Sequence, residues 1–305
     1  MNKKTLIAVV GPTAIGKTEL AIALAQHFKT EILSADSRQF FKEMSIGTAV
    51  PSTAELQAVP HHFIQHLSMR TPYSVGDFEK AALSDIKKLH VHNNFVVLVG
   101  GSGLYVDAVV HGLNQFPDIP ANIRQKLSER LNKEGIAHLQ IELKERDPDY
   151  YESVDLRNPH RVIRALEVCI ATGRPFSSFL KKNISERPFK TIFIGITADR
   201  NILYERINKR VDQMIQKGLV EEARPLFEHR HLNALQTVGY KELFRYFEGE
   251  ITLDFAISEI KKNTRRFAKR QLTWLRRNPD ILWVDHRDTL AEILSRLNMK
   301  ITSEK

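Results

Sequence analysis

One octapeptide constrains the fold of this chain more than any other feature. It is Gly11-Pro12-Thr13-Ala14-Ile15-Gly16-Lys17-Thr18, which fits the phosphate-binding pattern G-x-x-x-x-G-K-[ST]. The apolar run 6–10 predicts a buried strand before it, and the apolar spacing over 19–27 predicts a helix after it. A strand, this loop and a helix in that order are the context that the pattern requires. The sequence therefore predicts a P-loop, rather than a glycine-rich turn that binds nothing.

The residue types of this loop suit a phosphate. Its glycines let backbone amides turn toward an anion at the N-terminus of the following helix. Lys17 supplies a positive charge, and the Thr18 hydroxyl can ligate Mg²⁺. The first inference is a diphosphate or polyphosphate ligand, with ATP as the usual ligand of such a loop. The acidic strand end that commonly accompanies ATP hydrolysis is not evident, however.

Strand and helix patterns alternate along much of the chain. Further strands are expected at 31–34, 95–99, 191–196 and 281–284, and helices at 77–89 and 161–169. This alternation predicts an α/β fold with a P-loop NTPase-like core, in which helices flank a parallel sheet.

One segment departs from the alternation. Residues 117–146 show a charged amphipathic helix pattern bracketed by prolines, so we expect an inserted helical subdomain at 116–149. The core domain would then comprise 1–115 and 150–305, and it would include a mostly helical C-terminal part. The tail after Leu297 is expected to fray.

Composition excludes several classes of protein. The 305 residues are 42% hydrophobic and 27% charged, which is typical of folded globular chains. No apolar run approaches the roughly 18 residues that span a bilayer, and the N-terminal apolar stretch lacks a signal-peptide cleavage site. The single cysteine, Cys169, leaves neither an internal disulfide nor a cysteine-rich zinc site. We therefore expect a cytoplasmic protein with no membrane partner.

Most of the net charge of +9 lies in one segment. Residues 261–278 carry eight Lys and Arg and no acid, so the rest of the chain is close to neutral. The segment also holds an apolar stripe, Ile260, Phe267 and Trp274, which we expect to be core rather than a platform for stacking bases. The Lys and Arg side chains of this segment could simply face solvent, but eight cations without an acid favour binding of an anionic partner such as nucleic acid.

Three weaker signals remain open at this point. Gly100-Gly101-Ser102-Gly103 follows the strand at 95–99, either to leave space for a ligand or to form a tight turn. Asp36 follows the strand at 31–34, as a general base, an outer metal ligand or a turn residue. His61, His62 and His66 lack ligand spacing, so we expect hydrogen-bonded loop histidines rather than a metal site.

Together these pieces resemble the bacterial tRNA dimethylallyltransferases, also called tRNA isopentenyltransferases. The blocks that match, in the family's order, are 11–18, 36–39, 46–49, 61–64, 100–105, 158–167, 238–242 and 264–274. The family transfers a dimethylallyl group from dimethylallyl diphosphate to N6 of an adenosine next to the tRNA anticodon, with Mg²⁺. The resemblance thus implies dimethylallyl diphosphate and the tRNA anticodon stem-loop as partners, and we expect the protein to act as a monomer.

The resemblance also implies a role for each matching residue. Asp36 would be the general base, Lys17 and Thr18 would complete the catalytic set, and Thr18 would meet Mg²⁺ through the diphosphate. The diphosphate contacts would be Gly11, Pro12, Thr13, Ala14, Ile15, Gly16, Lys17 and Thr18. The tRNA contacts would be Asp36, Ser37, Arg38, Gln39, Ser102, Arg124, His160, Arg161, Arg164, Lys269, Arg270, Gln271, Thr273, Trp274 and Arg276.

Two departures and two alternatives accompany this interpretation. Many family members carry Tyr where this chain has Phe41, and Lys where it has Val50, so substrate contacts at those positions are in doubt. A P-loop kinase acting on a small metabolite, with the insertion as its lid, would explain the phosphate loop but not the basic segment. A non-catalytic RNA-binding protein would explain the basic segment but not the phosphate loop.

Overall fold

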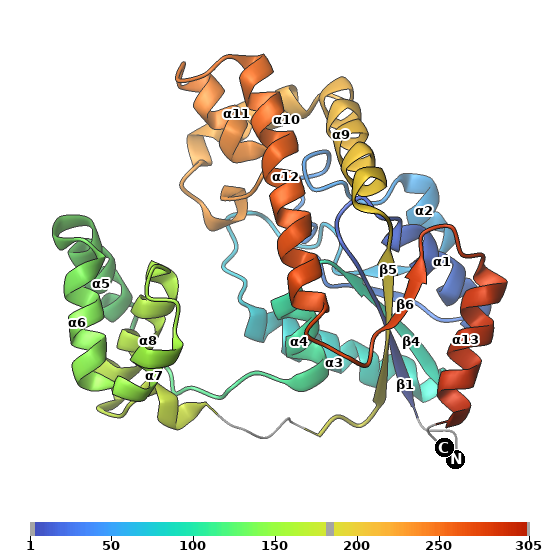
Figure 1. Cartoon of the computed structure of the whole chain (residues 1–305), viewed down its shortest axis with the longest axis horizontal. Coiled ribbons are helices and arrows are strands. Elements are labelled where there is room, and N and C mark those ends of the chain that lie inside the picture. Colours follow the sequence, from blue (N-terminus) through green and yellow to red (C-terminus); the bar gives the residue numbers. More distant parts are fainter. Residues whose placement is uncertain (1–3, 181–185, 304–305) are drawn as a thin grey trace. The chain divides into compact units, whose positions relative to one another are not determined.

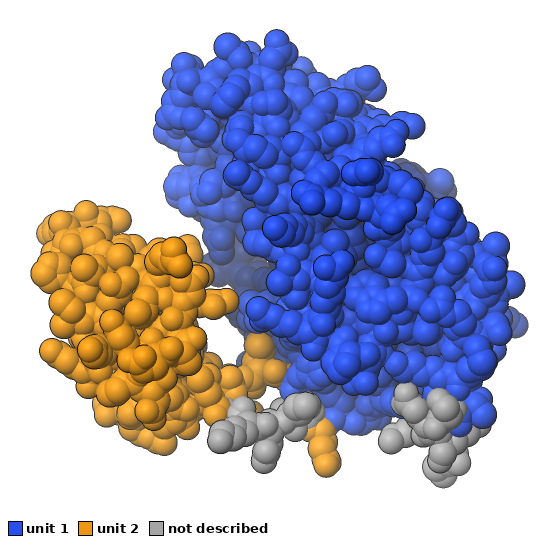
Figure 2. Space-filling view, in the orientation of Figure 1, with its two compact units in different colours: residues 1–111, 187–305 blue, residues 112–186 orange. Residues whose placement is uncertain are grey.

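A computed structural model describes residues 4–180 and 186–303 of the chain (Figure 1). It divides into two compact units, one formed by residues 1–111 and 187–305 and the other by residues 112–186 (Figure 2). We refer to them as the sheet unit and the helical unit.

The sheet unit is built on six parallel strands in the order β3-β2-β4-β1-β5-β6. They are β1 (Thr5–Val10), β2 (Ile32–Ser34), β3 (His61–His62), β4 (Phe95–Gly100), β5 (Lys190–Thr197) and β6 (Leu282–Asp285). In the central register, Ile7 of β1 pairs with Val97 of β4 and with Ile192 of β5. All six residues of β1 are buried, because both faces of the sheet are covered by helices. The predicted α/β fold with a parallel sheet is confirmed.

Helices cover both faces of this sheet, and α10 and α11 pack on α9 and α12. The helices of the sheet unit are α1 (Lys17–Phe28), α2 (Thr53–Ala58), α3 (Val75–His92), α4 (Gly103–His111), α9 (Arg200–Gln216), α10 (Leu219–Leu226), α11 (Tyr240–Phe247), α12 (Leu253–Leu275) and α13 (Leu290–Ser303). Leu6 and Ala8 of β1 face a core that includes residues of α3, α4, α11 and α12. Ile7 and Val9 face the opposite core, with residues of α1, α9 and α13. This alternation along one strand divides the hydrophobic core into two layers.

The expectation that the tail frays after Leu297 is wrong. Helix α13 continues to Ser303, and Leu297 is fully buried. Ile293, Leu297 and Ile301 recur at every fourth position, so they share one face of the helix and belong to the core cluster that includes α1.

The helical unit contains α5 (Ala121–Glu134), α6 (Ile136–Arg146), α7 (Pro148–Ser153), α8 (Pro159–Thr172) and a 3-10 turn, η1 (Phe176–Phe179). It is larger than the expected insertion at 116–149, since residues 150–186 belong to it and not to the sheet unit. The reason is the apolar face of α8, whose Val162 and Leu166 pack with Leu127 of α5 and Leu143 of α6. None of the helices in the described ranges is both long and apolar enough to span a bilayer.

Candidate active site

The predicted P-loop lies between β1 and α1. Gly16 caps α1 with φ at 109°, in the region that only glycine adopts freely. The Lys17 ammonium donates to the carbonyl of Pro12 at 2.8 Å, so it lies folded against the loop. Burial and the neighbouring Arg210 guanidinium lower the pKa of Lys17 to about 8, and the Asp36 carboxylate opposes that shift. The loop thus holds a cation that a bound anion would stabilise.

Sheet topology brings Asp36 to the same edge. β2 and β1 both neighbour β4, so their carboxyl ends and that of β4 open on one side of the sheet. Asp36 Oδ1 accepts a hydrogen bond from the backbone N–H of Arg38 at 3.0 Å, as a turn residue does. The side chain also lines the main cavity. Asp36 therefore combines the turn role with a place in the site.

Ser102 ties the β4 end to the Asp36 loop. Its hydroxyl accepts from the backbone N–H of Ser37 at 3.2 Å, and the two serine hydroxyls lie 3.3 Å apart. The glycines beside Ser102 are needed for close packing. A Cβ on Gly100 would lie 2.5 Å from the carbonyl oxygen of Ala35, and one on Gly103 would lie 2.6 Å from the Trp274 indole. Gly100 and Gly103 therefore let the Asp36 loop and α12 pack closely against the carboxyl end of β4.

Gln271 joins α12 to both loops. Its Oε1 accepts from the backbone N–H of Thr13 at 2.9 Å, and its Nε2 donates to the carbonyl of Gly101 at 2.9 Å. The side chain is buried. Gln271 is one of the residues for which the family resemblance implies an RNA contact; here both ends of its amide are bonded within the protein, where it holds the P-loop.

A cavity of about 630 Å³ lies at this edge of the sheet unit, and of the P-loop residues Thr13 lines it while Lys17 does not. Of the residues assigned a role from the sequence, the structure brings eight to it: Thr13, Asp36, Ser37, Arg38, Ser102, Arg270, Gln271 and Trp274. Further lining residues come mainly from the 236–241 segment and from α9 and α12, among them Ile207, Arg210, Val211, Met214, Thr237, Val238, Thr264 and Phe267. The cavity therefore joins polar groups at the sheet edge to an apolar wall.

Arg210 is a charged residue of the site that the sequence does not predict. It lies one helical turn beyond Arg206, whose guanidinium donates to the P-loop carbonyl of Ala14 at 2.8 Å. Burial lowers the pKa of Arg210, and the Asp36 carboxylate raises it. Nothing in the local sequence marks this arginine. Its place follows from β5, which pairs with β1 and feeds α9 toward the phosphate loop.

The apolar stripe of α12 is core only in part, so that prediction is wrong for Phe267. Ile260 is buried, but Phe267 is 38% exposed and lines the cavity together with the half-buried Trp274. All three members of the stripe border the cavity, and Ile260 and Trp274 also pack in or against the core cluster.

The basic segment divides into two groups. Lys261 pairs with Asp212 at 2.6 Å, Lys262 pairs with Glu259, and Arg265 donates to Asn208 at 2.7 Å. The other cations are exposed and have no ion-pair partner among the described residues: Arg266, Lys269, Arg270, Arg276 and Arg277. Two of the eight charges are thus paired with acids and Arg265 is held by a neutral amide, which leaves the five exposed cations, with the exposed Thr273 among them, open to an anionic ligand.

Four residues assigned to tRNA belong to the helical unit. Arg124 binds the buried carboxylate of Glu167 through two nitrogens, the second at 3.0 Å, and Arg164 approaches the same carboxylate at 3.4 Å. Arg164 also covers the Phe116 ring at 5.0 Å. His160 and Arg161 are exposed in the first turn of α8. Glu167 therefore holds the Arg124 and Arg164 guanidinium groups, although both side chains remain partly exposed.

The expectation of three loop histidines is wrong for His61 and His62, which form the edge strand β3, although both have polar partners. His61 Nδ1 lies 2.8 Å from the Val59 carbonyl, and His62 Nε2 lies 2.6 Å from the Glu31 carboxylate. His66 packs edge-on against Phe40 and Tyr73. Of the two departures, Phe41 is buried in the core and Val50 is half-buried.

We expect Gly103→Ala to destabilise the protein by about 1 to 3 kcal/mol, the usual cost of overpacking, because the new methyl would displace the Trp274 indole. Gly76→Ala is the matched control, since its Cβ would meet only the Ser74 hydroxyl, at 3.6 Å. Chemical denaturation measures both variants. Equal stability of the two would contradict the close packing at Gly103.

Comparisons with known proteins match the whole chain. The family model described as IPP transferase covers residues 39–278. A tRNA dimethylallyltransferase of Christiangramia forsetii is 57% identical, over 98% of this chain and 99% of its own. The solved tRNA isopentenylpyrophosphate transferase from Bacillus halodurans is 37% identical with a TM-score of 0.72, over 99% of this chain and 96% of its own. A eukaryotic dimethylallyltransferase, solved in snapshots of it acting on tRNA, is 25% identical with a TM-score of 0.78, over 99% of this chain and 77% of its own.

Proposed function

Since the chain belongs to the IPP transferase family, we propose that it transfers a dimethylallyl group from dimethylallyl diphosphate to N6 of an adenosine next to the tRNA anticodon. The observation that carries this proposal is the cavity bordered by Thr13 of the P-loop, Asp36 and Arg270 of α12. A small-metabolite kinase would not need the free cations of α12, and the family membership does not favour it. We further propose that the enzyme acts as a monomer in the cytoplasm, where tRNA is available.

The site acts on both the adenosine nucleophile and the diphosphate leaving group. An adenine amine is a weak nucleophile, because its lone pair is delocalised into the ring. Asp36 accepts a proton from N6 while the bond from N6 to the allylic carbon forms. The bond from that carbon to the diphosphate oxygen breaks, and its electron pair leaves with the diphosphate. Lys17, Arg210 and the P-loop amides stabilise the charge that develops there.

The apolar wall of the cavity suits the organic tail of the donor. Ile207, Val211 and Met214 on α9 face the same space as Arg210. A nucleoside triphosphate would instead place a polar ribose and base beyond the phosphate loop. An apolar wall beside the anion-binding end therefore supports a prenyl diphosphate.

The residues at the loop fit a magnesium ion carried by the substrate. Within the described residues there is no group of three or more His, Cys, Asp or Glu side chains placed to hold a metal. Mg²⁺ commonly binds through one or two protein oxygens, substrate phosphates and water. Thr18, directly after Lys17, would offer its hydroxyl to such an ion. When bound, the ion supplies positive charge to the diphosphate oxygens.

The target base must leave its stack to reach Asp36. An anticodon loop permits this more cheaply than a duplex does, since its bases are partly unpaired. The exposed Phe267 and the half-buried Trp274 offer ring faces beside the cavity. These rings provide surfaces on which a displaced base can stack.

We expect Arg266→Gln, Lys269→Gln and Arg276→Gln together to weaken RNA binding and reduce its salt dependence. Each phosphate contact contributes about 0.7 log units of slope on single-stranded RNA, so the loss should approach 2. Lys262→Gln is the control, because that ammonium is already paired with Glu259. Filter binding between low and moderate salt measures the slope. A slope equal to that of wild type would place the RNA on another surface.

One assay separates the proposal from its alternatives. The protein is incubated with Mg²⁺, dimethylallyl diphosphate and unmodified tRNA, and the digested tRNA is analysed by mass spectrometry. We expect one adenosine to gain one prenyl group and free diphosphate to appear. Consumption of ATP with a phosphorylated metabolite would favour the kinase, and unchanged reactants with bound tRNA would favour a binding protein.

A further inference from the structure

The carboxylate of Glu222 is surrounded by hydrogen-bond donors. It lies in the first turn of α10, and its Oε2 accepts from the backbone N–H groups of Ser45 and Ile46 at 2.9 and 2.7 Å. Its Oε1 accepts from the backbone N–H of Gly47 at 2.9 Å and from the Tyr240 hydroxyl at 2.7 Å. Both carboxylate oxygens are thus engaged by groups of this chain, and the proposed reaction gives these contacts no role.

We propose that Glu222 is a positioning residue of the transfer reaction, which holds the loop at 45–49 and, through it, the turn at 36–39 that presents Asp36 to N6. The inference rests on the proposed function, because it requires Asp36 to be the general base. It gives Glu222 no contact with either substrate. Glu222 does not line the catalytic cavity, whereas Gly47 and Asp36 do.

Gln39 connects the 45–49 loop to the Asp36 turn. Its Nε2 donates to the carbonyls of Thr48 and Ala49 at 3.2 and 3.0 Å, and its backbone N–H donates to the carbonyl of Asp36 at 3.1 Å. A displacement of the 45–49 loop would therefore move the acceptors that fix the Gln39 side chain. The turn would move with that side chain, and the Asp36 carboxylate with the turn.

Tyr240 supports the same loop by packing. Its side chain is fully buried, and a Cβ on Gly47 would lie 2.6 Å from the phenol ring, so the loop backbone rests directly on that ring. Burial and the Glu222 carboxylate raise the pKa of Tyr240, so the hydroxyl stays protonated and donates at neutral and mildly alkaline pH. Glu222 and Tyr240 therefore hold the loop together.

A neutral amide cannot replace the Glu222 carboxylate. A carboxylate offers two acceptor oxygens and bonds N–H groups more strongly than a neutral acceptor does. Glutamine has one oxygen, so its NH₂ group would face either the Ser45 and Ile46 amides or the Gly47 amide and the Tyr240 hydroxyl. Donors left without an acceptor favour a shifted loop. The substitution should thus displace the loop without removing a substrate contact.

The test measures Glu222→Gln with enzyme in excess over tRNA and at saturating dimethylallyl diphosphate. We expect the single-turnover rate to fall by about 10- to 100-fold, since a misplacement of about 1 Å can cost about 10²-fold. The dissociation constant for tRNA should change by less than about threefold. In an Asp36→Asn background the same substitution should slow transfer by less than about threefold, because the base that it displaces is already absent.

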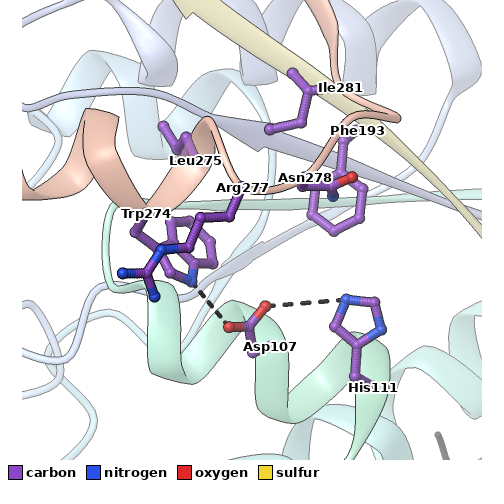
Figure 3. Close-up of a pocket in the computed structure, with 8 residues that line it drawn as sticks. All are labelled: Asp107, His111, Phe193, Trp274, Leu275, Arg277, Asn278 and Ile281. Carbon is purple, nitrogen blue, oxygen red and sulfur yellow. Dashed lines mark hydrogen bonds and ion pairs between the residues drawn. The ribbon is translucent and has the colours of Figure 1, made fainter.

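Two carboxylates provide matched controls. Glu221 is exposed, shares the first turn of α10 and does not line the catalytic cavity, so Glu221→Gln should keep the wild-type rate. Asp107 borders a second cavity, of about 300 Å³, and accepts from the Trp274 indole N–H at 2.9 Å (Figure 3). It has no printed contact with the Asp36 turn, so any effect of Asp107→Asn should be the same in the wild-type and Asp36→Asn backgrounds.

Two further measurements keep the inference testable. If Glu222→Gln melts early, Tyr240→Phe removes one of the four donors, keeps the ring on Gly47 and should slow transfer by about threefold. Amide hydrogen exchange tests the loop without activity, since protection at 45–47 should fall in Glu222→Gln and not in Glu221→Gln. Absence of prenylated product with wild type would contradict the proposed function. Unchanged protection, a wild-type rate in Glu222→Gln, or a loss that persists fully beside Asp36→Asn would overturn the positioning role alone.

Discussion

Replacing Asp36 with asparagine is expected to slow prenyl transfer by about 10² to 10⁴-fold, the usual effect of losing a general base. The amide oxygen can still accept the hydrogen bond from the Arg38 backbone, so the loop should keep its shape. The amide cannot take the proton from N6, however. We therefore expect the loss in the single-turnover rate and little change in the affinity for tRNA.

A matched control distinguishes the base from a general effect of charge. Asp85→Asn removes a carboxylate that pairs with Lys88 at 2.8 Å and does not line the catalytic cavity, and its rate should equal that of wild type. Rapid-quench measurement with enzyme in excess over tRNA isolates the chemical step. An Asp36→Asn rate within about threefold of wild type would remove Asp36 from the role of base.

The sequence predicts best those parts of the site that consist of consecutive residues or that lie at the end of a strand. The P-loop is recognisable because its glycines, Lys17 and Thr18 are consecutive, and because the strand and helix around it have distinct periodicities. Asp36 could be placed near it because a parallel sheet brings strand ends to one edge. These inferences depend only on short segments and on the order of the strands.

Other parts of the site depend on contacts between distant segments, which no local pattern contains. Arg210 reaches the phosphate loop only because β5 pairs beside β1, 180 residues along the chain from the loop's own strand. The sequence places Gln271 in a basic helix, and its bonds to Thr13 and Gly101 become evident only in the structure. The sequence also does not predict that the helical unit extends to residue 186, because the apolar face of α8 could pack equally well in either unit.

The charge of the basic segment shows the same limit. Counting residues 261–278 gives eight cations, but Lys261, Lys262 and Arg265 have partners on α9 or within α12. Asp212 and Asn208 lie about 50 residues earlier in the sequence, so a local count cannot include them. The predicted anionic partner is retained in the proposal, while the residues available to it are reduced to those on the exposed face.

Lys17→Ala is the other change expected to have a large effect, about 10² to 10³-fold on the transfer rate. The Lys17 ammonium lies against the P-loop, and its interaction with the diphosphate strengthens as negative charge develops on the leaving group. Arg206→Gln is a suitable control, because it removes a neighbouring cation whose observed bond is to the Ala14 carbonyl. Its effect should be much smaller. Equal losses in both variants would indicate that only the total positive charge matters.

The pH dependence gives this prediction a second measurement. Because the pKa of Lys17 is lowered to about 8, the free enzyme loses the catalytic charge above that pH, and kcat/KM for the diphosphate should decline. Between pH 8 and the ordinary lysine pKa near 10.4, the unfolded chain binds more protons at Lys17 than the folded chain does, so this residue makes the folded state more stable as pH rises. Activity and the Lys17 contribution to stability should therefore move in opposite directions, which separates titration of the site from unfolding. Lys17→Ala should lose the decline near pH 8, and a variant that kept it would assign the titration to another group.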